Sequence, residues 1–370
     1  MMPGFEYWAM LEPMKYYDKK REDLSDNLKK KYDAMVNNEN NEYVATCKYD
    51  GEWTMFIKWD GQYLIRSRSI SKVTGVYGDK TAHLPHLVEE MKSWPDNTVV
   101  LGEVCWGDFG TVSTDVGTIL RCLPAKAVER QKERKLVVKV FDVLAWNNVV
   151  LMNDPYGTRL HMAINKFDEN RPDSYFTSTD MCPSHMTPAE FADYVISKGG
   201  EGVVIQRTDY AYEPGKRAAW KTLKLKQKMP EMEFKVIASI PATMEYNGKY
   251  PDTWPYWFIE AELENEPSEL VNLDETPYER VAARHPEHSR WYPVTKPYYY
   301  GWHMGVRFEY NGVVCDASSG LTDADREWLG TIEAQKLIEN GGLYVTIRAM
   351  QEASLGGLRH PVIVRLRTDM

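Results

Sequence analysis

Five runs rich in β-branched residues follow one another in the first 226 residues, and each contains or borders charged residues. They read EYVATCKYDG, TVVLGEVCW, KLVVKVFDVL, EGVVIQR and WKTLKLK. Runs of this length and composition predict β-strands. In or beside them lie Lys48 and Asp50, Glu103, Phe141, Glu201, and Lys224 with Lys226. A single Lys-x-Asp-Gly carries little information, but the ordered set predicts strands that carry one polar site.

The organisation of the chain predicts two domains of the α+β class. A length of 370 residues allows this, and the pattern changes near Met229, which gives domains 1–229 and 230–370. In the first, strands alternate with helices near 22–36, in HLPHLVEEMKSW and after Thr187. Thr187 is the expected N-cap, with Pro188 at the first helical position and Gly199 at the end.

The second domain reads as short strands with one helix at about 323–329. The strands are predicted in EFKVIASI, WFIEAELE, HMGVRFEY, VVCDAS, LYVTIRAMQEA and PVIVRLR. This pattern favours a small β-barrel such as an OB-fold, with a loop-rich insertion around 247–297. Within the aromatic segment 291–302, the side chains either contact nucleic acid or pack onto their own domain, and we favour the second interpretation.

Composition excludes some classes of protein and leaves others open. Five cysteines without close pairing argue against a disulfide framework and predict a cytoplasmic protein. No apolar run approaches the roughly 18 residues of a membrane span, so we expect no membrane partner. The net charge is −9, but the segment 216–228 has six basic residues and no acid. An acidic chain with a basic groove is compatible with nucleic acid, although charge alone does not decide.

The residue types of the five runs suggest nucleotide chemistry. A lysine amine is a nucleophile only when it is neutral, and burial or nearby cations lower its pKa. Lys224 and Lys226 alternate on one strand and therefore share a face. If that face meets Lys48, we expect them to lower its pKa and to offset the charge of a triphosphate. Glu103 and Glu201 are suitable oxygen ligands for Mg²⁺, and Phe141 could stack on a purine or belong to the core.

With these motifs the sequence resembles the covalent nucleotidyltransferases, and most closely the small phage-type ATP-dependent DNA ligases. The segments KYDG, SRS, LGEV, VFDVL, EGVVI and YEPGKRAAWKTLKLK resemble the successive motifs of that family. FGTVSTDVGTILRC, SSGLTDADREWL and SLGGLRHPVIVRLRTDM are similar to further ligase segments. The resemblance implies an ATP-grasp-like adenylation domain of antiparallel sheets with helices, followed by an OB-fold barrel.

The resemblance also implies a reaction, its cofactors and its partner. Lys48 would take AMP from ATP, pass it to the 5′-phosphate of a nick in duplex DNA, and the 3′-hydroxyl would then displace AMP. Mg²⁺ is the implied metal, for which Mn²⁺ substitutes, and the protein is expected to encircle nicked duplex DNA as a monomer. The implied catalytic residues are Lys48, Asp50, Lys224 and Lys226.

Binding residues follow from the same resemblance. The nucleotide is expected to contact Thr46, Cys47, Lys48, Arg68, Glu103, Phe141, Glu201, Lys224 and Lys226. The metal ligands would be Asp50, Glu103 and Glu201, and the DNA contacts would include Arg68, Lys216, Arg217, Arg365 and Arg367.

The chain departs from the family pattern at three positions. Trp53 stands where an arginine usually follows the nucleophile, and Arg66 or Arg68 could replace its contact. Thr46 stands where an acidic or amide side chain often meets the adenine amino group. Met370 replaces the lysine of the C-terminal Arg-x-Asp-Lys motif, so that Arg365 and Arg367 would have to orient the leaving pyrophosphate.

Other functions remain open at this stage. An RNA ligase shares the lysyl-nucleotide chemistry, and an mRNA capping guanylyltransferase would use GTP instead. A non-enzymatic alternative is an OB-fold protein that binds single strands and has a degenerate transferase domain. The last alternative predicts that no nucleotide becomes attached to Lys48.

Overall fold

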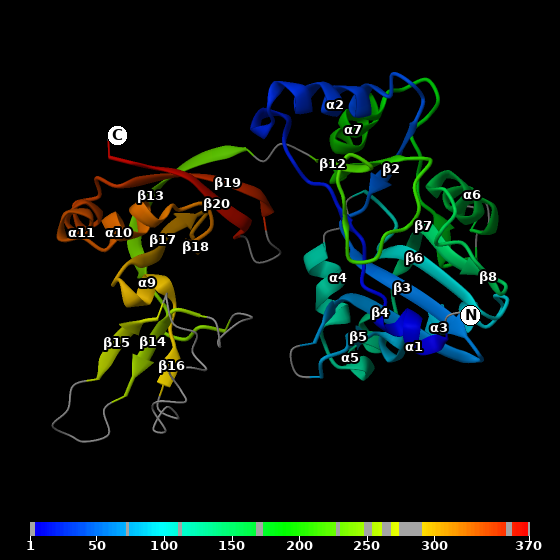
Figure 1. Cartoon of the computed structure of the whole chain (residues 1–370), viewed down its shortest axis with the longest axis horizontal. Coiled ribbons are helices and arrows are strands. Elements are labelled where there is room, and N and C mark those ends of the chain that lie inside the picture. The colour runs from blue at the N-terminus through cyan, green and yellow to red at the C-terminus, as the bar shows by residue number, and fades with distance from the viewer. Residues whose placement is uncertain are drawn as a thin grey trace. The chain divides into compact units, whose positions relative to one another are not determined.

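The computed structural model describes residues 4–71, 74–109, 113–167, 173–226, 230–247, 254–260, 268–273, 291–352 and 357–368. The chain divides into two compact units, Met1–Gln227 and Lys228–Met370. Each unit is described by itself (Figure 1). Within the described residues, no helix has both the length and the apolar character needed to cross a bilayer.

The larger sheet of the first unit has the strand order β5-β4-β3-β6-β7-β8, and β9 pairs with β7. Its strands are β3 (Glu52–Trp59), β4 (Gln62–Ile70), β5 (Tyr77–Asp79), β6 (Thr98–Cys105), β7 (Val137–Trp146), β8 (Val149–Val150) and β9 (Phe176–Ser178). One apolar cluster joins Phe56 and Val100 of this sheet to Leu87 of α3 (Pro85–Met91). A second cluster joins Met55 to Trp8 of α1 (Phe5–Met10). The sheet is therefore covered on both faces.

A smaller antiparallel sheet has the order β12-β10-β2, and its strands are β2 (Tyr43–Lys48), β10 (Gly202–Arg207) and β12 (Thr222–Lys226). Its apolar face packs on α2 (Asp26–Asn37) and α7 (Pro188–Ser197). α7 begins as predicted: the Thr187 hydroxyl accepts from the backbone N–H of Glu190, and Pro188 is the first helical residue. The strands β1 (Lys15–Tyr16) and β11 (Arg217–Ala218) form a short parallel pair, and β11 directly precedes β12 in the chain.

Four helices among the described residues of the first unit were not assigned from the sequence: α1, α4 (Ser113–Leu120), α5 (Pro124–Arg130) and α6 (Tyr156–Lys166). α4 and α5 together contribute Val116, Ile119 and Ala127 to the apolar cluster around Phe56. Each of these two helices has only two turns, and a helix that short is stabilised by packing more than by its own sequence. The apolar periodicity of such a short helix is therefore a weak signal in the sequence.

The second unit contains a five-stranded antiparallel sheet of order β18-β17-β13-β19-β20. Its strands are β13 (Glu231–Pro241), β17 (His303–Tyr310), β18 (Val313–Ala317), β19 (Tyr344–Glu352) and β20 (Leu358–Arg367). α10 (Asp323–Leu329) has the predicted bounds, and α11 (Ile332–Glu339) adds a helix that the sequence analysis did not assign. After β18, Ser319 accepts a hydrogen bond from the Ile363 N–H of β20 at 2.8 Å. The sheet thus curves into a half-barrel, while a closed OB-fold barrel is not established.

The described parts of the predicted loop-rich insertion 247–297 contain strands and a short helix. Its described parts form a separate sheet, β15-β14-β16, from β14 (Tyr256–Ile259), β15 (Glu269–Asn272) and β16 (Trp291–Pro293), followed by α9 (Lys296–Tyr299). WFIEAELE was predicted as a barrel strand, but its β14 belongs to this sheet because Trp257 and Trp291 form a local core. Within the aromatic segment 291–302, the Tyr300 ring stacks on the Trp302 ring with 4.8 Å between the ring centroids.

Candidate nucleotide site

The register of the smaller sheet gathers most of the residues singled out in the sequence. Gly202 of β10 pairs with Lys48 on one side and with Lys226 on the other. Val204 pairs in the same way with Thr46 and Lys224. Side chains alternate between the two faces of a strand, and the apolar face carries Ala45, Cys47, Val203, Ile205 and Leu223. Residues Thr46, Lys48, Val204, Gln206, Lys224 and Lys226 therefore share the opposite face.

A pocket of about 280 Å³ lies on that polar face. Most of its lining comes from β2, β10 and β12 of the smaller sheet and from β3, β4, β6 and β7 of the larger sheet. The lining residues are Tyr16, Thr46, Cys47, Lys48, Tyr49, Gly51, Glu52, Trp53, Arg68, Ser69, Glu103, Lys139, Phe141, Thr179, Val204, Gln206 and Lys224. The structure thus brings together Thr46, Cys47, Lys48, Arg68, Glu103, Phe141 and Lys224 from the predicted nucleotide set.

Glycine is needed at two of the motif positions for steric reasons. A Cβ at Gly51 would lie 2.1 Å from the carbonyl oxygen of Val104, and one at Gly202 would lie 2.1 Å from that of Leu225. Gly202 also has φ +140, which side-chain-bearing residues rarely adopt. These contacts allow the chain beside Lys48 and the chain after Glu201 to approach neighbouring strands closely. The Asp-Gly and Glu-Gly pairs therefore have a structural reason.

Carboxylates, and not cations, dominate the surroundings of Lys48. Its Nζ forms an ion pair with Glu201, and the side chains of the pair are only 19% and 10% exposed. Burial alone would lower the pKa of Lys48, but Glu201, Glu103 and Asp50 raise it above the ordinary value. The expectation that Lys224 and Lys226 lower the pKa of Lys48 is therefore wrong for the nucleotide-free protein. The carboxylates are nearer and favour the charged amine.

The lysine with a lowered pKa is Lys224. Burial lowers the pKa of Lys224 to about 8, with further contributions from Lys226 and Lys48. Asp18 partly offsets these effects, since it lies 3.8 Å from Lys224 and 3.2 Å from Lys226. Both lysines do point to one face, as predicted from their alternation. Lys226 also lies 3.7 Å from Glu201, although it is not part of the pocket lining.

The three predicted metal ligands all surround Lys48. The pKa of Glu103 is raised to about 8, mainly by burial and also by Glu201 and Asp50, while Lys48 opposes the rise. Glu103 also accepts a hydrogen bond from the Gly51 N–H at 3.2 Å. Among the described residues, no group of three or more His, Cys, Asp or Glu side chains is arranged to hold a metal ion by itself. The donor set still fits Mg²⁺, which commonly takes one or two carboxylates and completes its shell with water and phosphate oxygens.

Arg68 and Arg66 differ in their availability. Arg68 is exposed and lines the pocket. Arg66 is fully buried, stacks over Tyr77 at 4.0 Å, lies 5.7 Å from the Trp53 ring and donates to the carbonyl oxygen of Leu11. Of the two arginines that could replace the expected one at position 53, only Arg68 therefore reaches the pocket.

The remaining predicted residues lie outside this pocket. Lys216 directly precedes β11 and Arg217 is its first residue, and both are exposed. Arg365 and Arg367 lie on β20 of the second unit, where both approach Glu233. Asp369 and Met370 lie outside the described residues.

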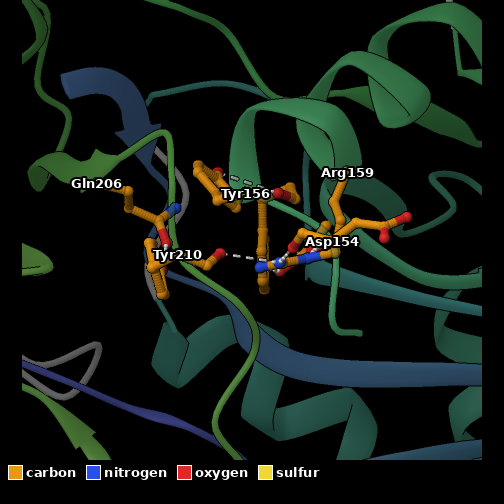
Figure 2. Close-up of polar contacts among 7 residues, drawn as sticks. Asp154, Tyr156, Arg159, Gln206 and Tyr210 are labelled. Atoms are coloured by element: carbon orange, nitrogen blue, oxygen red, sulfur yellow. Dashed lines mark hydrogen bonds and ion pairs between the residues drawn. The ribbon is translucent and has the colours of Figure 1, made fainter. Parts of the chain in front are cut away.

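Two parts of the site were missed in the sequence analysis. Gln206 lines the pocket and is 1% exposed, and its position two residues after Val204 on the EGVVIQR strand could have revealed it. A buried pair, Arg159 with Asp142, lies behind Phe141 with N–O distances of 2.8 and 3.1 Å. Figure 2 shows the polar contacts around Arg159. No sequence signal joins residues of β7 and α6 in this way.

Comparison with known proteins agrees with this geometry. Residues 23–226, more than half of the chain, match the family model described as ATP dependent DNA ligase domain. The chain therefore belongs to the ATP-dependent DNA ligase domain family.

Two relatives with similar sequences are named DNA ligase. The DNA ligase of Methanococcus aeolicus is 30% identical over 174 residues, which cover 46% of this chain and 30% of the relative. The DNA ligase of Thermococcus fumicolans is 27% identical over 203 residues, which cover 54% of this chain and 34% of the relative. The matched part of the chain thus spans about a third of the length of these relatives.

Solved structures extend the likeness to almost the whole chain. One comes from a study of Lig E DNA ligases described as "DNA binding with a minimal scaffold"; it has a TM-score of 0.56 at 17% identity and covers 97% of this chain and 99% of that one. Another structure, named Pmar-Lig_Pre, has a TM-score of 0.58 at 16% identity, and the match covers 97% of this chain and 68% of that one. These likenesses show a mixed α+β fold of the ligase type.

Proposed function

We propose that the protein is an ATP-dependent DNA ligase that seals nicks between a 3′-hydroxyl and a 5′-phosphate in duplex DNA. The observation that carries this proposal is the pocket that contains Lys48, Phe141 and Lys224 together. It combines a buried amine, an aromatic ring and a cation, which are the groups needed to hold a nucleotide by its base and phosphates. Membership in the ligase domain family supports ATP as the nucleotide.

In the first step, the neutral Lys48 amine attacks the α-phosphorus of ATP. A P–N bond forms, the P–O bond to the β-phosphate breaks, and pyrophosphate leaves. Because the pKa of Lys48 is raised in the free protein, the amine has to lose a proton first. Glu201 is in direct contact with the amine and can accept that proton. Lys224 and Arg68 are near enough to the pocket to offset the phosphate charge.

Two further steps complete the joining reaction. An oxygen of the 5′-phosphate at the nick attacks the lysyl-AMP phosphorus, the P–N bond breaks, and Lys48 takes a proton back. The 3′-hydroxyl then attacks the adenylated 5′-phosphate and AMP leaves. Asp50, next to the nucleophile in sequence, is proposed to orient the 3′-hydroxyl.

We propose that Glu103, Glu201 and Asp50 hold Mg²⁺, or Mn²⁺ in its place, together with phosphate oxygens. The cation would neutralise charge that develops on the phosphates. The raised pKa of Glu103, caused first by burial and then by Glu201 and Asp50, supports this assignment, since a nearby cation would favour the charged carboxylate.

The domains and the partner are part of the same proposal. We assign adenylation to residues 1–229 and an OB-fold role to residues 230–370. Lys216, Arg217, Arg365 and Arg367 supply charge for contact with the DNA backbone, and the protein acts as a monomer that encircles the duplex. The cysteines, all of them free thiols, support a cytoplasmic location.

A joining assay with a labelled nick tests the proposal. Purified protein is incubated with ATP or GTP, Mg²⁺ and a nicked duplex of either DNA or RNA, beside variants Lys48→Ala and Lys30→Ala. We expect joining of DNA with ATP by the parent and by Lys30→Ala, whose substitution lies on the exposed surface of α2. Preference for RNA would instead identify an RNA ligase, and dependence on GTP without joining would identify a guanylyltransferase.

A further inference from the structure

Gln206 is a buried glutamine in the lining of the pocket. Its side chain is 1% exposed, and it lies on the same face of the sheet as Thr46 and Lys224 because Ile205, its neighbour, points into the opposite apolar cluster. A buried amide is costly unless its hydrogen bonds are made. Its presence in the pocket lining therefore calls for a partner.

One half of that requirement is met by Tyr210. The Tyr210 hydroxyl donates to Oε1 of Gln206 over 2.7 Å, and both residues are buried (Figure 2). Burial holds the pKa of Tyr210 well above its ordinary value, so the hydroxyl keeps the proton that it donates. The contact orients the amide with Nε2 as the remaining donor. Among the described residues, none accepts a hydrogen bond from Nε2.

The same network also holds the wall that carries Phe141. The Arg159 guanidinium donates to the carbonyl oxygen of Tyr210 at 3.2 Å and binds Asp142 with two hydrogen bonds. The Tyr156 hydroxyl donates to the carbonyl oxygen of Phe141 at 3.2 Å (Figure 2). The amide of Gln206 and the backbone of Phe141 are thus fixed by one buried set of contacts.

Strand register sets how far Gln206 lies from the nucleophile. Gln206 pairs with Val44, whereas Lys48 pairs with Gly202. Four residues at 3.3 Å each separate the two positions by roughly 13 Å along the sheet. Along β10, Lys48 lies at the level of Gly202 and Gln206 lies at the other end of the row, with Lys224 between them at the level of Val204. A nucleotide attached through its α-phosphate to Lys48 then directs its base toward Gln206.

We propose that Gln206 forms hydrogen bonds with the base of the nucleotide and makes the pocket selective for adenine. Nε2 donates to a ring nitrogen of the purine, while the second lone pair of Oε1 accepts from the neighbouring 6-amino group. Guanine carries an oxygen at position 6, which would face Oε1 as acceptor against acceptor. A paired amide of this kind discriminates between bases by roughly 1–3 kcal/mol, which is about 5- to 150-fold.

This inference deepens the proposed function and rests on it for the position of the phosphates. It also gives a physical answer to the departure at Thr46. A threonine hydroxyl at that position lacks the amide or carboxylate that would meet the adenine amino group. Gln206, which reaches the pocket from β10, supplies an amide to the same space.

Equilibrium binding of ATP and GTP tests the inference without requiring the joining reaction. The dissociation constants are measured for the parent, Gln206→Leu and Tyr210→Phe. We expect the parent to bind ATP at least about 10-fold more tightly than GTP. Gln206→Leu should lose most of this ratio, chiefly through weaker ATP binding. Tyr210→Phe keeps its ring but no longer orients the amide, so its ratio should fall by a smaller factor.

A third nucleotide identifies the contact. Purine riboside triphosphate keeps the ring nitrogens but lacks the 6-amino group, and the parent should bind it more weakly than ATP, whereas Gln206→Leu should not distinguish the two. Gln131→Leu is the matched control, because Gln131 is a buried amide that bonds the carbonyl oxygens of His83 and Ala127 outside the pocket lining. Its ATP to GTP ratio should equal that of the parent.

The outcomes separate this inference from the proposed function. An unchanged ATP to GTP ratio in Gln206→Leu, or no preference in the parent, overturns the role of Gln206 even if Lys48 becomes adenylated. Equal weakening of ATP and GTP in Gln206→Leu also overturns it, because that pattern marks a purely structural role. Selective ATP binding without an adduct on Lys48 would sustain the role of Gln206 and contradict the ligase mechanism.

Discussion

The two faces of the sheet β12-β10-β2 differ sharply although they are made by alternate residues of the same strands. One face carries Ala45, Cys47, Val203, Ile205 and Leu223 against α2 and α7. The other carries Thr46, Lys48, Val204, Gln206 and Lys224 in the pocket. A change at one residue should therefore affect stability, and a change at the next should affect nucleotide chemistry. The alternation separates the two tasks within one strand.

The largest effect is expected at Lys48. Lys48→Ala removes the amine that forms the P–N bond, so joining of nicked DNA should be abolished. The free energy of unfolding should change little, because the side chain lies on the pocket face. A quantitative joining assay and urea denaturation measure both effects. Joining at a detectable fraction of the parent rate would contradict the assignment.

Lys224 should have the next largest effect on chemistry. Lys224→Ala removes a cation from the phosphate end of the pocket, and the loss of one such electrostatic contact costs roughly 100- to 1,000-fold in rate. Single-turnover adenylation and joining give the two rates, and gel-shift binding to nicked DNA should be largely retained. A variant that seals at the parent rate would remove Lys224 from the site.

A substitution on the apolar face should lower stability and leave the selectivity of nucleotide binding unchanged. Ile205 is fully buried beside Gln206, and Ile205→Ala should lower the free energy of unfolding by about 2–5 kcal/mol. The ATP to GTP binding ratio of the folded fraction should remain that of the parent. Urea denaturation followed by tryptophan fluorescence measures the loss. A change of the ratio with unchanged stability would contradict the separation of the two faces.

The smallest effect concerns pH. With its pKa lowered to about 8, Lys224 is charged below that pH and neutral above it, so ATP affinity should weaken as pH rises from about 7 to 9. The contribution of one proton is at most about tenfold per pH unit. Lys224→Arg stays charged throughout this range and should lose this part of the pH dependence. Identical slopes for the parent and the arginine variant would contradict the shifted pKa.

Residue patterns predicted the elements around the pocket well, because each strand carried both its β-branched run and its functional residue. α7 was predictable for a local reason, since Thr187 and Pro188 form a complete start signal. The ion pair of Arg159 with Asp142 was not predictable, because it joins α6 to β7 and only the fold brings these two buried side chains together. The separate sheet was not predicted for the same reason: β14, β15 and β16 are held by pairing and by Trp257 with Trp291.

The charge state of Lys48 shows a further limit of sequence patterns. Lys224 and Lys226 are visible as cations on one strand, and Glu201 is visible as an acid before another. Which of them touches Lys48 depends on register, and the register places Gly202, and with it Glu201, beside Lys48. The sign of the pKa shift therefore follows from an arrangement that the spacing of motifs does not contain.

The most direct test of the account is the intact mass of the protein after incubation with ATP and Mg²⁺, followed by peptide mapping of the modified residue. The account predicts an added mass of one AMP per chain, attached to Lys48 and released by pyrophosphate. No added mass, or an AMP found on another side chain, would contradict it.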